Sequence, residues 1–555
     1  MSVRKVLLSA ACVLAVFAGP ISAAGGRSSI DQTDLREWLS YLASDVLEGR
    51  AVYTEGLGLA AGYIQDHLRA WGVQPRGDAG RYLQTVKVLS VASTNRSSVT
   101  VRVGNDTRTF KDGQGINFSR NVGSKRTFTV DRVEFAGYGL DAPGARYSDL
   151  AGKDFTGALV VYLGNAGPQA VELEQSRRLL GGRGRWLTDQ MKAAGAIGPV
   201  SPQFAQPARA DAAQAASRQR RPDFVTTQRL DAPIAPSASA DDSLLEFLFS
   251  RAPVKYAELK AKAEAREPLP GFRLDGVSVT VSLDADYTVL RTQQTQNVVG
   301  VVEGSDPKLK STYVAVGAHY DHVGYAESEL GDDGKRSGAP GRVTSGAEAD
   351  RIWNGADDDG SGTVALMALA RAFAQGNRPK RSVLFVWHAG EERGLLGSRY
   401  YADYPTVALD QVVTQLNIDM IGRNRDNQTS ESNTVYLVGS DRISSELHQV
   451  NIAANRALDR PLTLDYEFND PADSEQLYFR SDHYSYAAKG IPVIFFTTGL
   501  HPDYHANTDE VSHIEFGKLA RVTQLVYETA WRVANLDHAP ARDFKGPRAG
   551  KGTRE

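Results

Sequence analysis

Five side chains of types that bind metal ions follow apolar runs in the second half of the chain. Each run has the pattern of a β-strand, so each of these residues stands where a strand is predicted to end. Ligands of open α/β sheets gather outside the carboxyl ends of the strands, so the five would meet at one edge. Two imidazoles and three carboxylates are enough to hold a pair of divalent metal ions. The candidate ligands are His319, Asp358, Glu392, Asp419 and His505.

Two further acidic residues stand beside predicted ligands and have side chains suited to assist them. Asp321 follows His319 by two residues, and a metal-bound imidazole usually donates its second N–H to an oxygen acceptor of this kind. Glu391 directly precedes Glu392, and adjacent residues point in different directions, so one carboxylate can bind metal while the other faces a substrate. A water near a divalent cation needs a base to take its proton, and a carboxylate of this pair can serve as that base.

Each of these signals has an ordinary structural explanation when it is taken alone. The aspartate run in NGADDDGSG is also typical of a solvated turn, and a pair of glutamates is also typical of a charged surface. Asp419 is harder to explain in this way, because it lies within the apolar sequence LNIDMIG, where an aspartate is normally paired or bound to metal. The occurrence of all five residues at successive strand ends therefore favours one metal site over separate structural explanations.

Strands and helices alternate from about residue 296 onward, which indicates a largely parallel sheet covered by helices. The helix SGTVALMALARAFAQG is predicted to have Ser361 as its N-cap and Gly376 as its stop. The fold class is therefore α/β, with a mainly parallel mixed sheet sandwiched by helices and an inserted β-rich domain. The predicted strands are NVVGVVEG, TYVAVGA, SVLFVWHA, VVTQLNIDM, TVYLVG and IPVIFFT.

Composition shifts divide the chain into five predicted parts. Residues 1–23 have the basic start, apolar stretch and small-residue cleavage site of a signal peptide. Residues 24–98 contain two amphipathic helices and complete an α/β domain with residues 290–538. Residues 99–289 contain short β-like runs and form the inserted domain, and residues 539–555 are a basic, Pro/Gly-rich tail predicted to be disordered.

Charge and cysteine content narrow the possible partners and the location of the protein. A net charge of −3 over 555 residues gives no reason to expect nucleic acid as a partner. The single cysteine, Cys12, lies within the predicted signal peptide, so the mature chain would have no disulfide and no thiolate ligand. No segment of the mature chain is apolar enough to span a membrane. We expect export to the periplasm or the medium; an uncleaved anchor and lipid attachment at Cys12 are the alternatives.

The same segments resemble the secreted bacterial co-catalytic dizinc aminopeptidases, relatives of glutamate carboxypeptidase and the transferrin receptor. The resemblance covers nearly the whole mature chain. LASDVLEGR and AAGYIQDHLRAWGVQP resemble the family's N-terminal helices, and VEFAGYGLDAP with GALVVYLGNAGP resembles an inserted protease-associated domain. The strings that match around the site are GAHYDH, NGADDDGSG, HAGEERGLLGS, NIDMIG, FRSDHYSY with GIPVIFF, and YHANTDE.

The resemblance implies two bound Zn²⁺ ions, separated by roughly 3.5–4 Å as in other two-metal sites. His319 and Asp419 would hold one ion, Glu392 and His505 the other, and Asp358 would bridge them. The family also implies a cis peptide bond after the bridging aspartate. Manganese or cobalt are possible substitutes, because the ligands are imidazoles and carboxylates.

The implied activity is removal of N-terminal residues from peptides with a free amino terminus. A water between the metals would attack the scissile carbonyl, with Glu391 as general base and a tyrosine stabilising the oxyanion. Tyr478 and Tyr504 both resemble tyrosines used by relatives, and Tyr478 is the preferred candidate. The alternatives are a related dizinc carboxypeptidase or dipeptidase, and a non-catalytic receptor-like binding protein. A Gly-rich, charged loop at 325–350 is expected to hang over the rim of the site.

Overall fold

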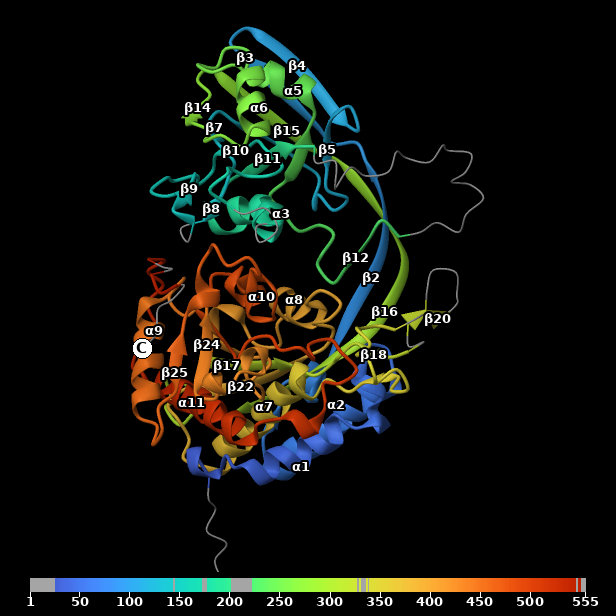
Figure 1. Cartoon of the computed structure of the whole chain (residues 1–555), viewed down its shortest axis with the longest axis vertical. Helices are drawn as coiled ribbons and strands as arrows, with labels where there is room; N and C mark the ends of the chain where they lie inside the picture. Colours follow the sequence, from blue (N-terminus) through green and yellow to red (C-terminus); the bar gives the residue numbers. More distant parts are fainter. Residues whose placement is uncertain are drawn as a thin grey trace, which may run out of the picture.

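Two domains are joined by a long two-stranded ribbon in this computed structural model (Figure 1). The predicted signal peptide lies outside the residues that the structure describes. Among the described residues, no helix combines the length and apolar character needed to cross a membrane. The described residues are 25–142, 145–171, 177–200, 222–326, 329–330, 336–337, 339–545 and 548–550.

The larger domain, here called the main domain, is built on a mixed sheet with the strand order β12-β2-β16-β22-β17-β23-β26-β24-β25. The central strands β22, β17, β23 and β26 are parallel, whereas β16 pairs with β22 and β24 pairs with β26 in antiparallel fashion. The predicted α/β fold with a mixed sheet is confirmed. The strands are β2 (Leu83–Asn95), β12 (Phe224–Thr226), β16 (Ala285–Val302), β17 (Tyr313–His319), β22 (Ser382–His388), β23 (Val412–Ile418), β24 (Thr434–Val438), β25 (Thr463–Asp465) and β26 (Val493–Thr497).

Helices cover both faces of this sheet, which explains why its central strands are apolar throughout. Every residue of β17, β22 and β23 is buried, and successive side chains enter the cores on opposite faces. One core packs against α1, α2, α7, α9 and α11, and the other packs against α8 and α10. The helices are α1 (Gln32–Leu42), α2 (Glu55–Trp71), α7 (Gly362–Gln375), α8 (Leu396–Asp403), α9 (Ser445–Arg456), α10 (His483–Ala487) and α11 (Phe516–Asn535).

The start of α7 differs from the prediction. Ser361 is not an N-cap, because its own backbone is helical and its side chain makes no capping hydrogen bond. Its hydroxyl instead donates to the Asp357 carbonyl at 2.8 Å and accepts from the Ile421 N–H at 3.0 Å. The serine therefore ties the aspartate turn to the end of β23, a long-range contact that local sequence does not reveal.

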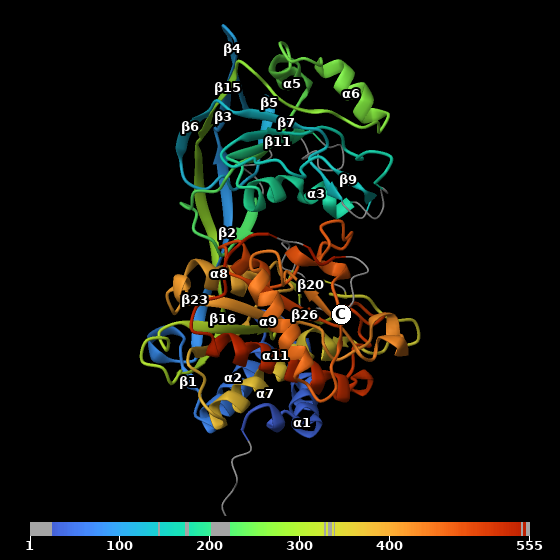
Figure 2. The ribbon, with the colours of Figure 1, turned by 90° about the vertical axis from the view of Figure 1, so that its left-hand side faces the viewer.

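The inserted domain has its own sheet, with the order β14-β7-β10-β11-β13-β5-β4-β3-β15-β6, and its own apolar core. It spans Ser98 to Leu283, and β2 and β16 form the ribbon that connects it to the main domain (Figure 2). The strands are β3 (Ser98–Val103), β4 (Asp106–Asp112), β5 (Gly115–Phe118), β6 (Arg126–Val130), β7 (Val133–Ala136), β10 (Leu159–Val161), β11 (Gly195–Pro199), β13 (Ser237–Ala240), β14 (Gly271–Arg273) and β15 (Val277–Leu283). The helices are α3 (Arg177–Arg185), α5 (Asp242–Leu248) and α6 (Tyr256–Glu264).

The predicted disorder of the tail is wrong for its described residues, 539–545 and 548–550. The backbone N–H groups of Arg548 and Ala549 both donate to the buried Asp441 carboxylate at 2.8 Å, and Asn469 donates to the Ala549 carbonyl. Composition predicted a solvated tail, but a buried carboxylate needs hydrogen-bond donors, and the tail backbone supplies them.

A buried arginine joins the N-terminal helices to the sheet. Arg50 is 1% exposed, and its guanidinium donates to the backbone carbonyls of Leu42, Tyr320, Asn354 and Gly355. Tyr320 directly follows β17, and Gly355 directly precedes the aspartate turn. One side chain therefore holds two chain segments that lead to candidate metal ligands.

We predict that Arg50→Ala lowers the free energy of unfolding of the main domain by about 3–5 kcal/mol, because it leaves four buried carbonyls without their donor. The measurement is urea denaturation followed by near-UV circular dichroism. Arg69→Ala is the control, since Arg69 is largely exposed and forms an ion pair with exposed Asp66. Equal unfolding midpoints for the two variants would contradict the structural role of Arg50.

Candidate metal centre

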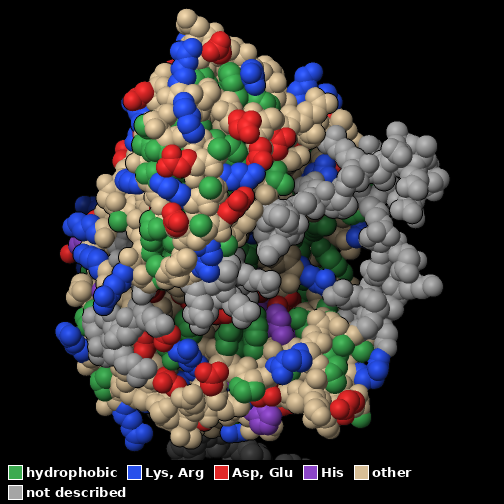
Figure 3. Space-filling model, turned by 45° about the horizontal axis from the view of Figure 1, so that its top comes forward, with side chains coloured by type: hydrophobic (Ala, Val, Ile, Leu, Met, Phe, Trp, Pro, Cys, Tyr) green, Lys and Arg blue, Asp and Glu red, His purple; other side chains and the backbone are tan. Residues whose placement is uncertain are grey.

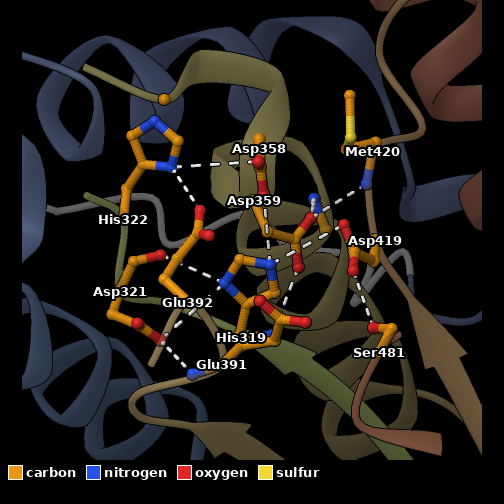
Figure 4. Close-up of polar contacts among 12 residues, drawn as sticks. His319, Asp321, His322, Asp358, Asp359, Glu391, Glu392, Asp419, Met420 and Ser481 are labelled. Atoms are coloured by element: carbon orange, nitrogen blue, oxygen red, sulfur yellow. Dashed lines mark hydrogen bonds and ion pairs between the residues drawn. The ribbon is translucent and has the colours of Figure 1, made fainter. Parts of the chain in front are cut away.

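The five predicted ligands lie together at the carboxyl ends of the central strands, and Figure 4 shows four of them. His319 ends β17, Asp419 directly follows β23, and Glu392 lies in the turn after β22. Asp358 lies in the turn before α7, and His505 lies in a loop that follows β26. Parallel strands deliver their ends to one edge, so residues far apart in sequence meet there.

The two oxygens of the Asp358 carboxylate face different imidazoles. Asp358 Oδ1 is 3.2 Å from His319 Nε2, which is also 3.7 Å from Asp419 Oδ1. Asp358 Oδ2 is 3.1 Å from His505 Nε2, which is also 2.9 Å from Glu392 Oε2. This geometry matches two ligand groups that share a bridging carboxylate.

A third histidine, His322, joins the second group and was missed in the sequence. Its Nδ1 lies 2.9 Å from Glu392 Oε1 and 4.0 Å from Asp358 Oδ2, and its side chain is fully buried. His322, Asp358 and Glu392 form one group with metal-ligand spacing, and His319, Asp358 and Asp419 form another, so that Asp358 belongs to both. The available signal was its position in GAHYDH, three residues after His319 at the same strand end.

The donor atoms fit divalent cations. His319 Nε2, His322 Nδ1, Asp358 Oδ2 and Glu392 Oε1 are buried and lie near one another, but none makes a hydrogen bond within the described chain. Burying polar atoms without partners is costly, and a shared cation removes that cost. Imidazole nitrogens and carboxylate oxygens without thiolates form a donor set that zinc accepts.

The electrostatics of the cluster also call for positive charge. Burial by itself lowers the pKa of His505, but contacts with Asp358 and Glu392 raise it to about 11. Burial likewise opposes protonation of His319, yet Asp419 and Asp358 raise the pKa of this imidazole well above its usual value. The carboxylates thus favour protonated, positively charged imidazoles at His319 and His505. A metal ion bound by these residues would supply the positive charge in place of those protons.

Asp321 acts on its surroundings differently from the prediction. The backbone carbonyl oxygen of Asp321 lies 3.1 Å from His319 Nδ1, within hydrogen-bond distance. The carboxylate Oδ1 is farther from the same nitrogen, at 3.8 Å. That Oδ1 accepts from the backbone N–H groups of Gly390 at 2.7 Å and Glu391 at 3.2 Å. The carboxylate therefore holds the turn that carries Glu391, while the carbonyl orients the imidazole.

Glu391 faces a small pocket of about 40 Å³ whose lining also includes Asp358 and Asp419. Burial raises the pKa of Glu391 well above its usual value, and the neighbouring carboxylates of Glu392 and Asp419 add to this effect against the opposing influence of His319.

The surface between the two domains is hollowed on the face seen in Figure 3, where acidic and histidine side chains are visible. The rest of the pocket lining has an apolar part, formed by Met420, Leu477, Phe495, Gly499 and Leu500, and also includes Arg480, Ser481, Thr497 and Tyr504.

The two candidates for the oxyanion tyrosine, Tyr478 and Tyr504, lie in different surroundings. Tyr478 is 1% exposed, its ring lies 3.9 Å from the guanidinium carbon of Arg442, and it does not line the pocket. Tyr504 does line the pocket, stacks on His505 at 4.0 Å between ring centroids, and accepts a hydrogen bond from Arg480 at 3.1 Å. Both tyrosines have suitable sequence positions, and only side-chain direction separates them.

The three adjacent aspartates have separate tasks. Asp357 Oδ1 accepts from the Gly422 N–H at 2.6 Å, and Asp359 accepts from the backbone N–H groups of His319, Gly362 and Met420. Their carboxylates therefore bind backbone around the site. The predicted cis peptide bond is present between Asp358 and Asp359.

Asp509 holds this aspartate turn from the opposite side and was also missed in the sequence. Its carboxylate accepts from the backbone N–H groups of Asp357 and Asp358 at 3.0–3.1 Å. His501 Nε2 lies 3.2 Å from Asp357 Oδ2 and extends the network. His501 and Asp509 flank the predicted ligand His505 in the sequence. Their proximity to it was therefore visible, but the direction of their side chains toward the aspartate turn was not.

The described part of the 325–350 loop lies against the segment that carries His505. The Arg342 N–H donates to the His505 carbonyl at 2.7 Å, and the Asn507 N–H donates to the Arg342 carbonyl at 3.1 Å. A Cβ atom on Gly341 would lie 2.5 Å from the His505 carbonyl oxygen, so this close approach requires glycine. His505 has a left-handed backbone with φ 53°, an uncommon conformation that these contacts support.

Comparisons with known proteins find similarity to peptidases. Residues 297–530 match peptidase family M28. Leucine aminopeptidase 1 of Trichophyton equinum is 26% identical over 240 residues, which are 41% of this chain and 56% of the relative. A probable leucine aminopeptidase of Arthroderma otae is 26% identical over 267 residues, 43% of this chain and 64% of the relative. The chain thus spans somewhat more than half the length of these curated relatives.

Solved aminopeptidase structures align along most of the chain. The aminopeptidase of Aneurinibacillus sp. strain AM-1 is 17% identical with a TM-score of 0.42, covering 95% of this chain and 99% of its own. The zinc aminopeptidase BSAP of Bacillus subtilis is 16% identical with a TM-score of 0.41, covering 93% of this chain and 99% of its own.

We predict that His505→Ala and His322→Ala affect metal binding differently. His505→Ala should reduce bound zinc from two ions to one per chain, because His505 Nε2 faces both Asp358 and Glu392. His322→Ala should retain two ions but weaken the second by about 10–100-fold, because Glu392 loses its contact with His322 while His505 still faces it. Chelator competition with metal analysis measures both. Loss of an ion only in His322→Ala would reverse the two roles.

Proposed function

We propose that this chain, whose residues 297–530 belong to peptidase family M28, is an exported dizinc aminopeptidase that removes N-terminal residues from peptides. The observation that carries the proposal is the double ligand group around Asp358, with Glu391 beside it at an apolar pocket. Export rests on the signal-peptide pattern of residues 1–23. The relatives include proteins named leucine aminopeptidase, and aminopeptidase activity is proposed for this chain as well.

The metal ligands divide into two sets. His319 and Asp419 would hold one zinc ion, Glu392 and His505 the other, and Asp358 would bridge the two. Zinc held by these residues would supply Lewis acidity and make a water molecule easier to deprotonate.

Glu391 is proposed as the group that moves the proton. It takes a proton from the attacking water and returns it to the nitrogen of the departing peptide. Asp321 fixes the backbone of this residue, because its carboxylate accepts a hydrogen bond from the Glu391 N–H at 3.2 Å. Tyr504, held by Arg480, has its hydroxyl at the pocket wall, where it would stabilise the negative charge that develops on the carbonyl oxygen.

The apolar wall indicates which first residue fits. Met420, Leu477, Phe495 and Leu500 stand next to Glu391, so an apolar side chain would be desolvated beside the reacting carbonyl. The substrate's free amino group would meet the acidic edge formed by Asp358, Glu391 and Asp419. This combination supports an aminopeptidase acting on apolar N-terminal residues.

We expect the mature chain to hydrolyse leucine p-nitroanilide and to leave its N-acetyl counterpart intact, because a blocked amine cannot pair with the acidic edge. Activity should disappear after chelation and return with zinc. The assay measures p-nitroaniline release at fixed protein concentration. Cleavage of neither compound by protein containing two zinc ions would reject the aminopeptidase proposal and direct attention to carboxypeptidase and dipeptide substrates.

Glu391→Gln should lower kcat by about 10²–10⁴-fold while two zinc ions remain bound, because it removes the proton acceptor but no ligand. Metal content and turnover are measured on the same preparation. Glu37→Gln, at an exposed position of α1, is the control and should change neither quantity. A Glu391→Gln protein that has lost zinc would show that Glu391 is a ligand instead of the base.

A further inference from the structure

The inserted domain contacts the main domain at a second place besides the ribbon. Helix α3 lies on the side of the inserted domain that faces α8 and α10 of the main domain, as Figures 1 and 2 show. A helical turn, Trp186–Gln190, continues α3. Across from it is the main-domain segment 477–487, which contains the turn Leu477–Phe479 and helix α10.

A hydrogen bond between the domains lies at the centre of this contact. The Tyr484 hydroxyl of α10 donates to Asp189 Oδ2 of the inserted domain at 2.6 Å. Tyr484 is only 5% exposed, so this bond is largely shielded from water. Arg185 adds a cationic contact, with its guanidinium carbon 5.9 Å from the Tyr484 ring centroid. Hydrogen bonds to a charged acceptor are among the stronger ones in proteins.

An aromatic contact lies beside this hydrogen bond. The rings of Trp186 and Phe479 meet edge to face, with centroids 5.9 Å apart and planes inclined by 72°. The Arg442 guanidinium lies between the domains, 5.7 Å from the Trp186 ring and 3.9 Å from the Tyr478 ring. The inserted domain therefore touches both the short turn and the helix of segment 477–487.

The segment that receives these contacts forms one wall of the pocket. Leu477, Arg480 and Ser481 line it together with Glu391. The Ser481 hydroxyl also donates to Asp419 Oδ2 at 2.6 Å. Any shift of this segment would therefore change the space available to the first residue of a substrate.

The local structure of the segment is too short to hold its own position. It begins after Gln476, whose φ is +52°, and continues as a three-residue 3₁₀ turn and the five-residue helix α10. Helices of this length are marginal without tertiary contacts. Packing must therefore place the segment, and part of that packing comes from Trp186 and Asp189.

We propose that Trp186 and Asp189 of the inserted domain are positioning residues that set the shape of the substrate pocket through Phe479 and Tyr484. This inference rests on the proposed aminopeptidase function and assigns the inserted domain a role in selecting the first residue of the substrate. Neither residue touches the reacting atoms, so both act on specificity through the wall formed by segment 477–487.

The first test measures the position of the wall without any substrate. Asp189→Ala and Tyr484→Phe each remove the interdomain hydrogen bond, and hydrogen exchange followed by mass spectrometry should show faster exchange at 477–487 in both. Tyr147→Phe is the matched control, because it breaks a tyrosine–aspartate bond of the same 2.6 Å length to Asp149 within the inserted domain. Unchanged exchange at 477–487 in both interdomain variants would overturn the proposal.

The second test measures selectivity as kcat and KM for leucine and alanine p-nitroanilides. Both interdomain variants should lower the leucine-to-alanine ratio of kcat/KM by about three- to tenfold, mainly through KM, with two zinc ions retained. The double variant should lose no more than either single one, since both changes remove the same bond. Trp186→Leu should act in the same direction, and Tyr147→Phe should leave the ratio unchanged.

The two tests separate this inference from the proposed function. An unchanged leucine-to-alanine ratio, or fully additive effects in the double variant, would refute the positioning role even though the enzyme is an aminopeptidase. If the wild-type chain cleaves neither substrate, the aminopeptidase proposal fails, and the selectivity claim fails with it. The exchange experiment then still decides whether the inserted domain positions segment 477–487.

Discussion

The mutual repulsion of buried carboxylates at one sheet edge is the constraint on which the rest of this structure depends. Asp358, Glu392 and Asp419 lie close together in a site that is almost closed to water, where uncompensated negative charge is expensive. Imidazoles and metal ions can offset that charge only if they reach the same point. Backbone N–H groups stabilise two further buried carboxylates, those of Asp509 and Asp359. Each accepts hydrogen bonds from more than one N–H group, and these bonds hold the surrounding turns in place.

The two domains divide the work of building this site. The main domain contributes the candidate metal ligands, and His319, Glu392 and Asp419 among them stand at or shortly after the ends of strands that are buried on both faces. The inserted domain contributes no candidate ligand among its described residues, but it touches the pocket wall through Trp186 and Asp189. The ribbon of β2 and β16 joins both sheets, so the insertion is anchored at two separated places.

Local pattern was sufficient to identify the elements and the residue types at their ends. The apolar runs that became β17, β22 and β23 were recognisable because residues buried on both faces of a sheet must all be apolar. A charged residue at the end of such a run has few ordinary explanations, and His319 and Asp419 were therefore visible in the sequence. The general rule that parallel strands end at one edge then placed them together, without knowledge of any distance.

Side-chain direction and long-range contact were decided only by the tertiary structure. Tyr478 and Tyr504 have equally suitable sequence positions, yet one ring turns into the core and the other lines the pocket. His322 joins the centre although its position in GAHYDH does not by itself separate it from a structural histidine. The Asp321 carboxylate binds backbone N–H groups instead of the neighbouring imidazole. The sequence by itself determined the order of the elements and the chemical types at their ends, because periodicity and burial are local properties. The tertiary structure decided which of those groups meet, because their partners are distant in sequence and leave no local pattern.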